Sequence, residues 1–187
     1  MFDELLRYPG VVEECELRSP FGFLAIHGGS LERGTAEVAT DAAERGDASL
    51  YAVRQPDDLH WHIPSALVDP SGAPALNAFL QHVDLVVSIH GYGRKGHANV
   101  VLIGGRNRQL ATRAASVLRA AVPSHRFVDD LHAIPRTLRG VHVDNPVNRP
   151  RGGGIQLELP PTLRNRDGAT SDHEALVAAL ASLATAT

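Results

Sequence analysis

The sequence predicts an α/β fold with one central β-sheet between layers of helices, a three-layer αβα arrangement. Short β-like runs alternate along the chain with helix-like runs, which is typical of this fold class. Residues 21–27 and 84–90 are mostly apolar, as expected for strands buried on both faces. Residues 106–121 repeat apolar side chains at helical spacing. The length of 187 residues suits one domain, so we expect residues 1–187 to form a single domain.

The expected strands are short and are bounded by turn signals. A pair of glycines closes the run 99–103, and residues 155–159 alternate polar and apolar side chains after three glycines. Residues 60–64 are expected at a sheet edge, because Pro64 has no N–H for a ladder. In chain order, strands are expected at 11–18, 21–27, 49–53, 60–64, 84–90, 99–103 and 155–159.

The expected helices follow from composition and end signals. Residues 35–45 are rich in Ala and Glu and precede Gly46, a glycine C-cap, and Thr35 is a candidate N-cap. Helices are expected at 35–45, 73–82, 106–121 and 171–184. The connection 131–154 is loop-like and rich in Pro, Asn and Arg, and a loop of this length in a compact domain is usually functional.

Composition excludes several classes of protein. The net charge of −3 offers no basic field for nucleic acid. No apolar run approaches the roughly 20 residues that span a membrane, and the acidic start lacks the features of a signal peptide, so a cytoplasmic protein is expected. Cys15 is the single cysteine, which excludes an internal disulfide and a cysteine-based zinc finger. Any metal site must therefore use His, Asp or Glu.

Two expected strands each deliver a histidine at their carboxyl end. His27 is followed by two glycines and by Glu32, and His90 is followed by Gly91. Sites in open α/β sheets lie outside the carboxyl ends of strands. Two histidines and one glutamate form a ligand set of catalytic zinc, with one position left open. The alternatives are a structural histidine, an exposed turn acid at Glu32, and Glu37 as the rival carboxylate, which falls inside the expected helix.

Glu158 is the candidate general acid/base. It shares one side of the expected strand with Gln156, while the other side is apolar. Beside a metal, this carboxylate would take a proton from water and deliver it to the leaving amine. The alternative is a solvent-facing sheet surface.

Several polar and basic residues are candidates for holding an anionic substrate. Arg94 lies in a glycine-rich segment after His90, and Tyr92 in the same segment could steady an oxyanion. A second group surrounds the long loop and comprises Asn145, Asn148, Arg149, Arg151 and Arg164. The alternative for each arginine is a solvated charge. His60 and His62 share a strand face but lack a third ligand nearby, so we interpret them as structural. Neither a phosphate-binding loop nor a Gly-x-Ser-x-Gly elbow is present.

With these residues in place, the chain resembles the poly-γ-glutamate hydrolase family, small zinc enzymes related to carboxypeptidase A-like peptidases and similar to N-formylglutamate amidohydrolases. The resemblance rests on motifs in the family's order over nearly the whole chain. They are Ala25-Ile26-His27-Gly28-Gly29-x-x-Glu32-x-Gly34-Thr35-x-Glu37, Ser88-Ile89-His90-Gly91, Val101-x-Ile103-Gly104-Gly105, Asn145-x-x-Asn148-Arg149, and Gly153-Gly154-x-Gln156-Leu157-Glu158-Leu159 with Leu163-Arg164. The segment 92–96 varies in such proteins, so substrate preference is not carried over from it.

The resemblance implies a carboxypeptidase-like fold with a mixed central sheet. It also implies Zn²⁺ on His27, Glu32 and His90, Glu158 as general acid/base, and cleavage of an amide bond to glutamate. The expected function is therefore a zinc-dependent amidohydrolase acting on poly-γ-glutamate or a related γ-glutamyl substrate. Two alternatives stay open: an amidase on cell-wall peptides or N-acyl amino acids, and an inactive module that binds acidic peptides. The sequence does not identify protein partners.

Overall fold

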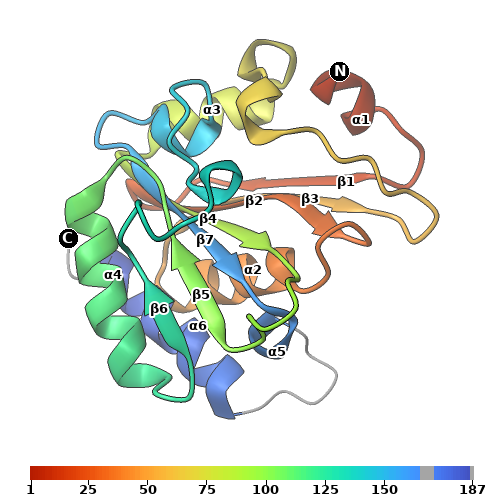
Figure 1. The fold of residues 1–187 in the computed structure, drawn as a ribbon. Helices are drawn as coiled ribbons and strands as arrows, with labels where there is room; N and C mark the ends of the chain where they lie inside the picture. The colour runs from red at the N-terminus through yellow and green to blue at the C-terminus, as the bar shows by residue number, and fades with distance from the viewer. Residues whose placement is uncertain (165–170, 186–187) are drawn as a thin grey trace.

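The computed structural model describes residues 1–164 and 171–185, and its centre is a seven-stranded sheet (Figure 1). Its strands are β1 (Val12–Glu16), β2 (Phe21–Gly29), β3 (Ser49–Gln55), β4 (Leu85–Gly91), β5 (Val100–Ile103), β6 (Arg126–Val128) and β7 (Gly154–Leu159). Its helices are α1 (Phe2–Leu6), α2 (Thr35–Arg45), α3 (Pro74–His82), α4 (Arg108–Ala121), α5 (Pro161–Arg164) and α6 (Ser171–Thr185). Short 3₁₀ turns are η1 (Ser65–Leu67), η2 (Pro70–Gly72), η3 (Arg136–Leu138) and η4 (Pro146–Asn148).

The sheet is mixed, with the strand order β1-β3-β2-β4-β7-β5-β6. The central strands β3, β2, β4 and β7 are parallel to their neighbours in this group. β1 is antiparallel to β3, and β5 is antiparallel to β7. The α/β class and the mixed sheet are thus confirmed. The short strand β6, which pairs in parallel with β5, was not predicted, because three residues carry too little periodicity.

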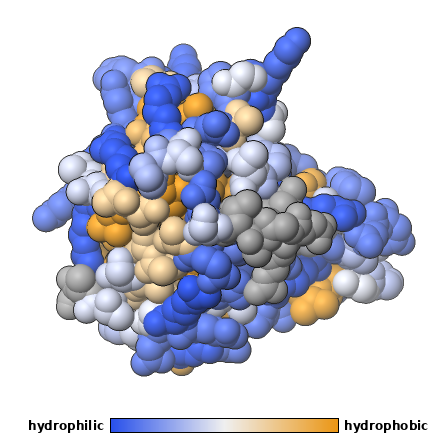
Figure 2. Space-filling model, turned by 90° about the horizontal axis from the view of Figure 1, so that it is seen from below, coloured by the Kyte–Doolittle hydropathy of each residue, from blue (hydrophilic) through white to orange (hydrophobic). Residues whose placement is uncertain are grey.

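Helices α2, α4 and α6 cover one face of the sheet (Figure 1). Their contact positions are mostly alanines and leucines, so the helices pack closely against the apolar side chains of β2, β4, β5 and β7. Seen from below, the side on which α5 and α6 lie, hydrophilic side chains cover much of the surface and leave smaller apolar areas (Figure 2). No helix in residues 1–164 or 171–185 is long and apolar enough to cross a membrane.

The other face is covered less uniformly. Helices α1 and α3 pack there over a second core that includes Leu24, Ile26 and Val86 of the sheet. Towards β5 and β6 this face is covered by the long connection 131–154, whose Ile134 packs on Tyr92 and Leu102. Because a loop rather than a helix covers this part of the sheet, the polar side chains on it border a cavity instead of a helix–sheet interface.

Two expectations for local structure were wrong. Residues 60–64 form no strand, because the Gln55 side chain holds Trp61 through two hydrogen bonds, to the Trp61 carbonyl and from its N–H. The segment is therefore anchored by a side chain and not by a ladder. The N-cap of α2 is Gly34 instead of Thr35, whose hydroxyl donates to the Glu32 carbonyl.

Candidate metal and catalytic site

The site lies at the ends of the neighbouring strands β2 and β4, from which the chain proceeds towards opposite edges of the sheet. After β2 it continues to β3, towards one edge, and after β4 it continues to β5, towards the other edge. β2 and β4 are paired from Phe21–Leu85 only as far as Leu24–Ser88. His27 and His90 lie beyond the last pair, at the carboxyl ends of the two strands. This is the switch point at which open α/β sheets place their ligands.

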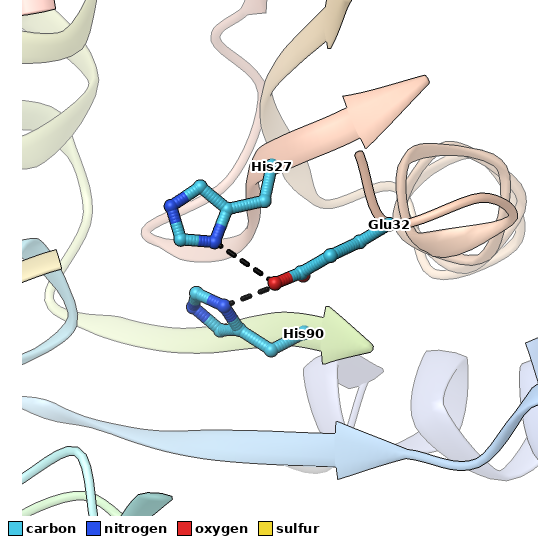
Figure 3. A group of neighbouring side chains, drawn as sticks. All are labelled: His27, Glu32 and His90. Carbon is cyan, nitrogen blue, oxygen red and sulfur yellow. Dashed lines mark hydrogen bonds and ion pairs between the residues drawn. The ribbon is translucent and has the colours of Figure 1, made fainter. Parts of the chain in front are cut away.

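His27, Glu32 and His90 point toward one another (Figure 3). One possible ligand atom from each lies within 4.8 Å of the others. Glu32 reaches the histidines because its backbone N–H donates to the His27 carbonyl at 2.9 Å, which folds the turn back over the end of β2. Both histidines are only 3% exposed. The structure therefore brings together the three residues for which the sequence predicts metal binding.

The turn depends on Gly29, which has a φ of 74° in the left-handed region. A Cβ atom at this position would lie 2.2 Å from the Gln55 carbonyl oxygen. Glycine avoids both the backbone strain and the collision. Gly29 therefore lets the chain turn from His27 towards Glu32 while β2 stays close to β3.

The charges in this group favour an ionised carboxylate. Burial works against ionisation of Glu32, but His90 and His27 outweigh it and hold the pKa of Glu32 far below its ordinary value. Burial likewise opposes a charged His90, yet the Glu32 carboxylate outweighs it and raises the pKa of His90. Glu32 also accepts a hydrogen bond from the Gly91 N–H at 2.8 Å.

The donor atoms fit a zinc ion. The Ile63 carbonyl lies 2.9 Å from His27 Nε2 and can only accept, so Nε2 carries the proton. In the neutral imidazole, His27 Nδ1 then directs its lone pair at Glu32 Oε1, 3.1 Å away. Two acceptors at this separation need a proton or a cation between them. His90 Nδ1 lies 3.5 Å from the other Glu32 oxygen, so a cation bound by all three residues would satisfy the group.

Glu158 lies beside this group, because it is the cross-strand partner of His90 in the β4–β7 ladder. Ile155, Leu157 and Leu159 pack in the core beneath the helices, so the alternation of β7 places Glu158 on the opposite, cavity-lining face. Burial raises the pKa of Glu158 to about 7, with His90 acting against the shift and Glu32 adding to it. The carboxyl group can thus both hold and release a proton near neutral pH.

A cavity of about 770 Å³ opens over these side chains. Its wall includes several residues that sequence reasoning did not assign to the site: His62, Arg136, Arg139, His142 and Gln156. The His62 ring lies 4.9 Å from that of His27 between centroids. The only available signal for the loop residues was the unusual length of the connection 131–154, which did not indicate which side chains face inward.

The predicted substrate residues on the long loop have different positions. Asn145 lines the cavity and is 3% exposed. Asn148 donates to the carbonyls of Gly140 and His142 and accepts from the Arg106 N–H, so its side chain ties the loop together. Arg149 lies off the cavity wall and binds Asp144 through the backbone carbonyl and the carboxylate. Only Asn145 of these three lies on the cavity wall.

Three further predicted substrate residues also lie off this wall. Arg164 packs behind Gly91 and donates to the backbone carbonyls of Arg33 and Leu159, so backbone groups occupy its guanidinium. The Tyr92 hydroxyl donates to the Val100 carbonyl at 2.6 Å. Tyr92 and Arg94 border a separate cavity of about 80 Å³. Glu37, the rival ligand, lies on α2 and pairs with Arg54 at 3.6 Å.

The mixed α/β sheet with its flanking helices defines a metallo-carboxypeptidase-like class of fold. A metallo-carboxypeptidase from Burkholderia cenocepacia superposes with a TM-score of 0.50 at 12% identity, covering 98% of this chain and 65% of that one. Within this class, the chain belongs to the poly-gamma-glutamate hydrolase family, whose model matches residues 6–174.

Individual relatives agree with this assignment. The SPbeta prophage-derived UPF0714 protein YoqZ of Bacillus subtilis is 35% identical over 139 residues, which cover 73% of this chain and 47% of YoqZ. A bacteriophage poly-gamma-glutamate hydrolase has the same fold, with a TM-score of 0.80 at 24% identity over 96% of this chain and 91% of that one. A zinc-free structure of YndL gives a TM-score of 0.69 at 26% identity, covering 82% and 73% of the two chains. This chain spans about half the length of its curated Bacillus subtilis relatives, 47% of YoqZ and 58% of YndL.

Proposed function

We propose that this chain, residues 1–187, is one zinc-dependent hydrolase domain that cleaves glutamyl amide bonds in poly-γ-glutamate or a related γ-glutamyl substrate. The observation that carries the proposal is the meeting of His27, Glu32 and His90 within 4.8 Å of one another, in the cavity that Glu158 also lines. Membership of the poly-gamma-glutamate hydrolase family supports the bond type.

His27, Glu32 and His90 would hold the metal. Zinc bound there would supply Lewis acidity for the scissile carbonyl and would make a water molecule more acidic. Glu158 would accept a proton from the attacking water and return it to the leaving nitrogen, a role that suits a carboxyl group with a pKa near neutral. The Ile63 carbonyl and the Gly91 N–H would hold His27 and Glu32 in orientation.

The wall of the cavity favours an anionic substrate. Arg136 and Arg139 face it from one loop, and neither forms an ion pair with any residue in 1–164 or 171–185. Val141 and Val143 on the same loop are exposed. A γ-linked glutamate chain carries one free carboxylate and two main-chain methylenes per unit, so arginines and valines together match both parts of it. We propose that these arginines bind substrate carboxylates.

The test combines metal content with turnover. We expect about one zinc per chain in the purified protein by plasma mass spectrometry, and its loss in His90→Ala. We expect the zinc-loaded protein to shorten poly-γ-glutamate and not poly-α-glutamate. Absence of zinc after reconstitution would contradict the metal site. Bound zinc with tight polyglutamate binding and no turnover would instead indicate a binding module, and cleavage of cell-wall peptides alone would indicate an amidase.

A further inference from the structure

Three buried side chains form a continuous hydrogen-bonded chain that ends on Glu158. Asn145 Nδ2 lies 2.9 Å from Gln156 Oε1, and Gln156 Nε2 lies 2.8 Å from Glu158 Oε1. The three residues are only 3%, 5% and 4% exposed. Buried polar groups of this kind lose little to competition from water, so their hydrogen bonds orient them strongly.

The donor and the acceptor of each of these hydrogen bonds follow from the orientation of the Asn145 side-chain amide. The Val147 backbone N–H can only donate, and it donates to Asn145 Oδ1 at 3.2 Å. The other end of the Asn145 amide is therefore the NH₂ group, which donates to Gln156. Gln156 must accept through Oε1 and can only present its own NH₂ group to Glu158. The orientation of the Gln156 amide is thus set by a backbone donor, the Val147 N–H, which is three hydrogen bonds away from Glu158.

We infer that Asn145 and Gln156 are positioning residues that confine the transferable proton of Glu158 to its Oε2 atom. Oε1 already accepts from Gln156, and a proton on Oε1 would oppose the Gln156 NH₂ group. No residue in 1–164 or 171–185 donates to Oε2, and Glu158 lines the cavity, so Oε2 is the oxygen available to substrate and water. The inference rests on the proposed function, in which Glu158 is the proton carrier.

The proton balance of the reaction then uses a single oxygen. As the water oxygen bonds to the amide carbon, its proton moves to Oε2. As the C–N bond breaks, the same proton moves from Oε2 to the leaving nitrogen. Rotation of the protonated carboxyl group by half a turn would exchange the two oxygens and set the O–H group against the Gln156 NH₂ group, so that two donors would face each other. The hydrogen bonds from Asn145 to Gln156 and from Gln156 to Glu158, called the relay from here on, therefore hold Oε2 in place through both transfers.

The loop that carries the arginines packs against the same relay. An ideal Cβ at Gly140, where φ is 62°, would lie 2.6 Å from Gln156 Oε1. One Gly140 hydrogen therefore faces this oxygen at close range. The contact provides a signature of orientation, because a flipped Gln156 would place its NH₂ protons against Gly140 instead.

The experiment changes Asn145, the side chain that sets the orientation of the Gln156 amide. Asp in Asn145→Asp keeps the acceptor for Val147 but has no NH₂ group, so Gln156 should flip and present Oε1 to Glu158. Gln156→Leu removes the relay. Asn107→Asp is the matched control, because Asn107 also accepts a backbone N–H through Oδ1, as the N-cap of helix α4, and donates to a carbonyl, but far from Glu158. Asn145→Ser keeps the cap and is the fallback if the acidic variant folds poorly.

We expect Asn145→Asp and Gln156→Leu each to lower kcat of the zinc-loaded protein by about tenfold to a hundredfold, with KM nearly unchanged. The double variant should lose no more than Gln156→Leu alone, because Asn145 acts only through Gln156. Asn107→Asp should keep the wild-type kcat. Additive losses in the double variant, or equal changes in kcat and KM, would overturn the inference.

A second readout does not depend on turnover. In NMR spectra, Asn145→Asp should show nuclear Overhauser contacts between the Gln156 side-chain amide and the Gly140 α-protons that are stronger than in the wild type. Unchanged contacts would contradict the relay. If the wild-type protein hydrolyses nothing, the proposed function fails while these contacts still decide the orientation of Gln156.

Discussion

His90 and Glu158 are direct partners across the parallel ladder between β4 and β7, and both side chains are buried on the same face. One is a candidate metal ligand and the other a candidate proton carrier. Because two neighbouring strands carry them, their separation is set by the spacing of the sheet and not by a loop. This rigidity suits a site that must hold catalytic groups in fixed geometry.

Glu158→Gln should separate metal binding from turnover. Glutamine keeps the shape of the side chain and can still meet Gln156, but it cannot carry a proton. We expect zinc content by mass spectrometry to stay near one per chain, while kcat falls by about 10² to 10⁴. The variant Glu37→Gln, on helix α2, is the control. Activity near the wild-type level in Glu158→Gln would remove Glu158 from the mechanism.

Arg136→Ala and Arg139→Ala should weaken binding of polyglutamate more than they slow its cleavage. Each removes a cation that faces the cavity without an ion-pair partner among residues 1–164 and 171–185. We expect KM to rise by about three- to tenfold per variant with kcat nearly constant, and the effect to shrink at high salt because exposed charges are screened. Arg151→Ala, at a residue outside the cavity wall, should leave KM unchanged; an equal rise there would point to a general charge effect.

Gly29→Ala should destabilise the fold and disturb the arrangement of His27, Glu32 and His90. The added Cβ would lie 2.2 Å from the Gln55 carbonyl oxygen, and the alanine would also have to adopt a positive φ. We expect a loss of about 2–4 kcal/mol in the free energy of unfolding, from strain and overpacking together. Gly153→Ala is the matched control, since its φ is 63° but no atom lies within 4 Å of its Cβ, and it should lose only about 1–2 kcal/mol. Equal losses in urea unfolding would contradict the collision.

The metal-free protein should become less stable as the pH rises through neutrality. The raised pKa of Glu158, about 7, means that the native state keeps a proton which the unfolded chain releases near pH 4.3. Between about pH 4.3 and pH 7 the native state binds more protons than the unfolded chain, so the free energy of unfolding falls as the pH rises through this range. Glu158→Gln removes this contribution and should gain on the order of 2 kcal/mol relative to wild type between pH 5 and pH 8.

Urea unfolding in the presence of a chelator at the two pH values measures this difference. Glu44→Gln, at an exposed position of α2, is the control and should show no pH-dependent gain. A Glu158→Gln difference that is the same at pH 5 and pH 8 would mean that Glu158 does not titrate in this range.

Local pattern in the sequence was enough to predict most of the sheet and to single out His27, Glu32 and His90, which the fold brings together. Continuous apolar runs marked β2 and β4, because strands buried on both faces need them. His27 and His90 follow these runs directly, and Glu32 is only five residues further on, so the turn is a local event. The alternation of polar and apolar residues along β7 likewise predicted that Glu158 faces away from the apolar side, and it lines the cavity.

The tertiary structure decided what the long loop does. His62, Arg136 and Arg139 reach the cavity through contacts between segments far apart in the chain, and nothing in their own neighbourhood indicates this. Arg139 donates only its Nε to a backbone carbonyl, that of Ile134. Arg164 carries the same charge, yet it donates to the two carbonyls of Leu159 and Arg33 and lies off the cavity wall. Whether an arginine meets a ligand or a carbonyl depends on which buried backbone groups need a donor, and that is known only once the chain has folded. Sequence periodicity determines the elements and the chemistry at their ends, whereas packing determines which of the remaining polar groups stay free for substrate.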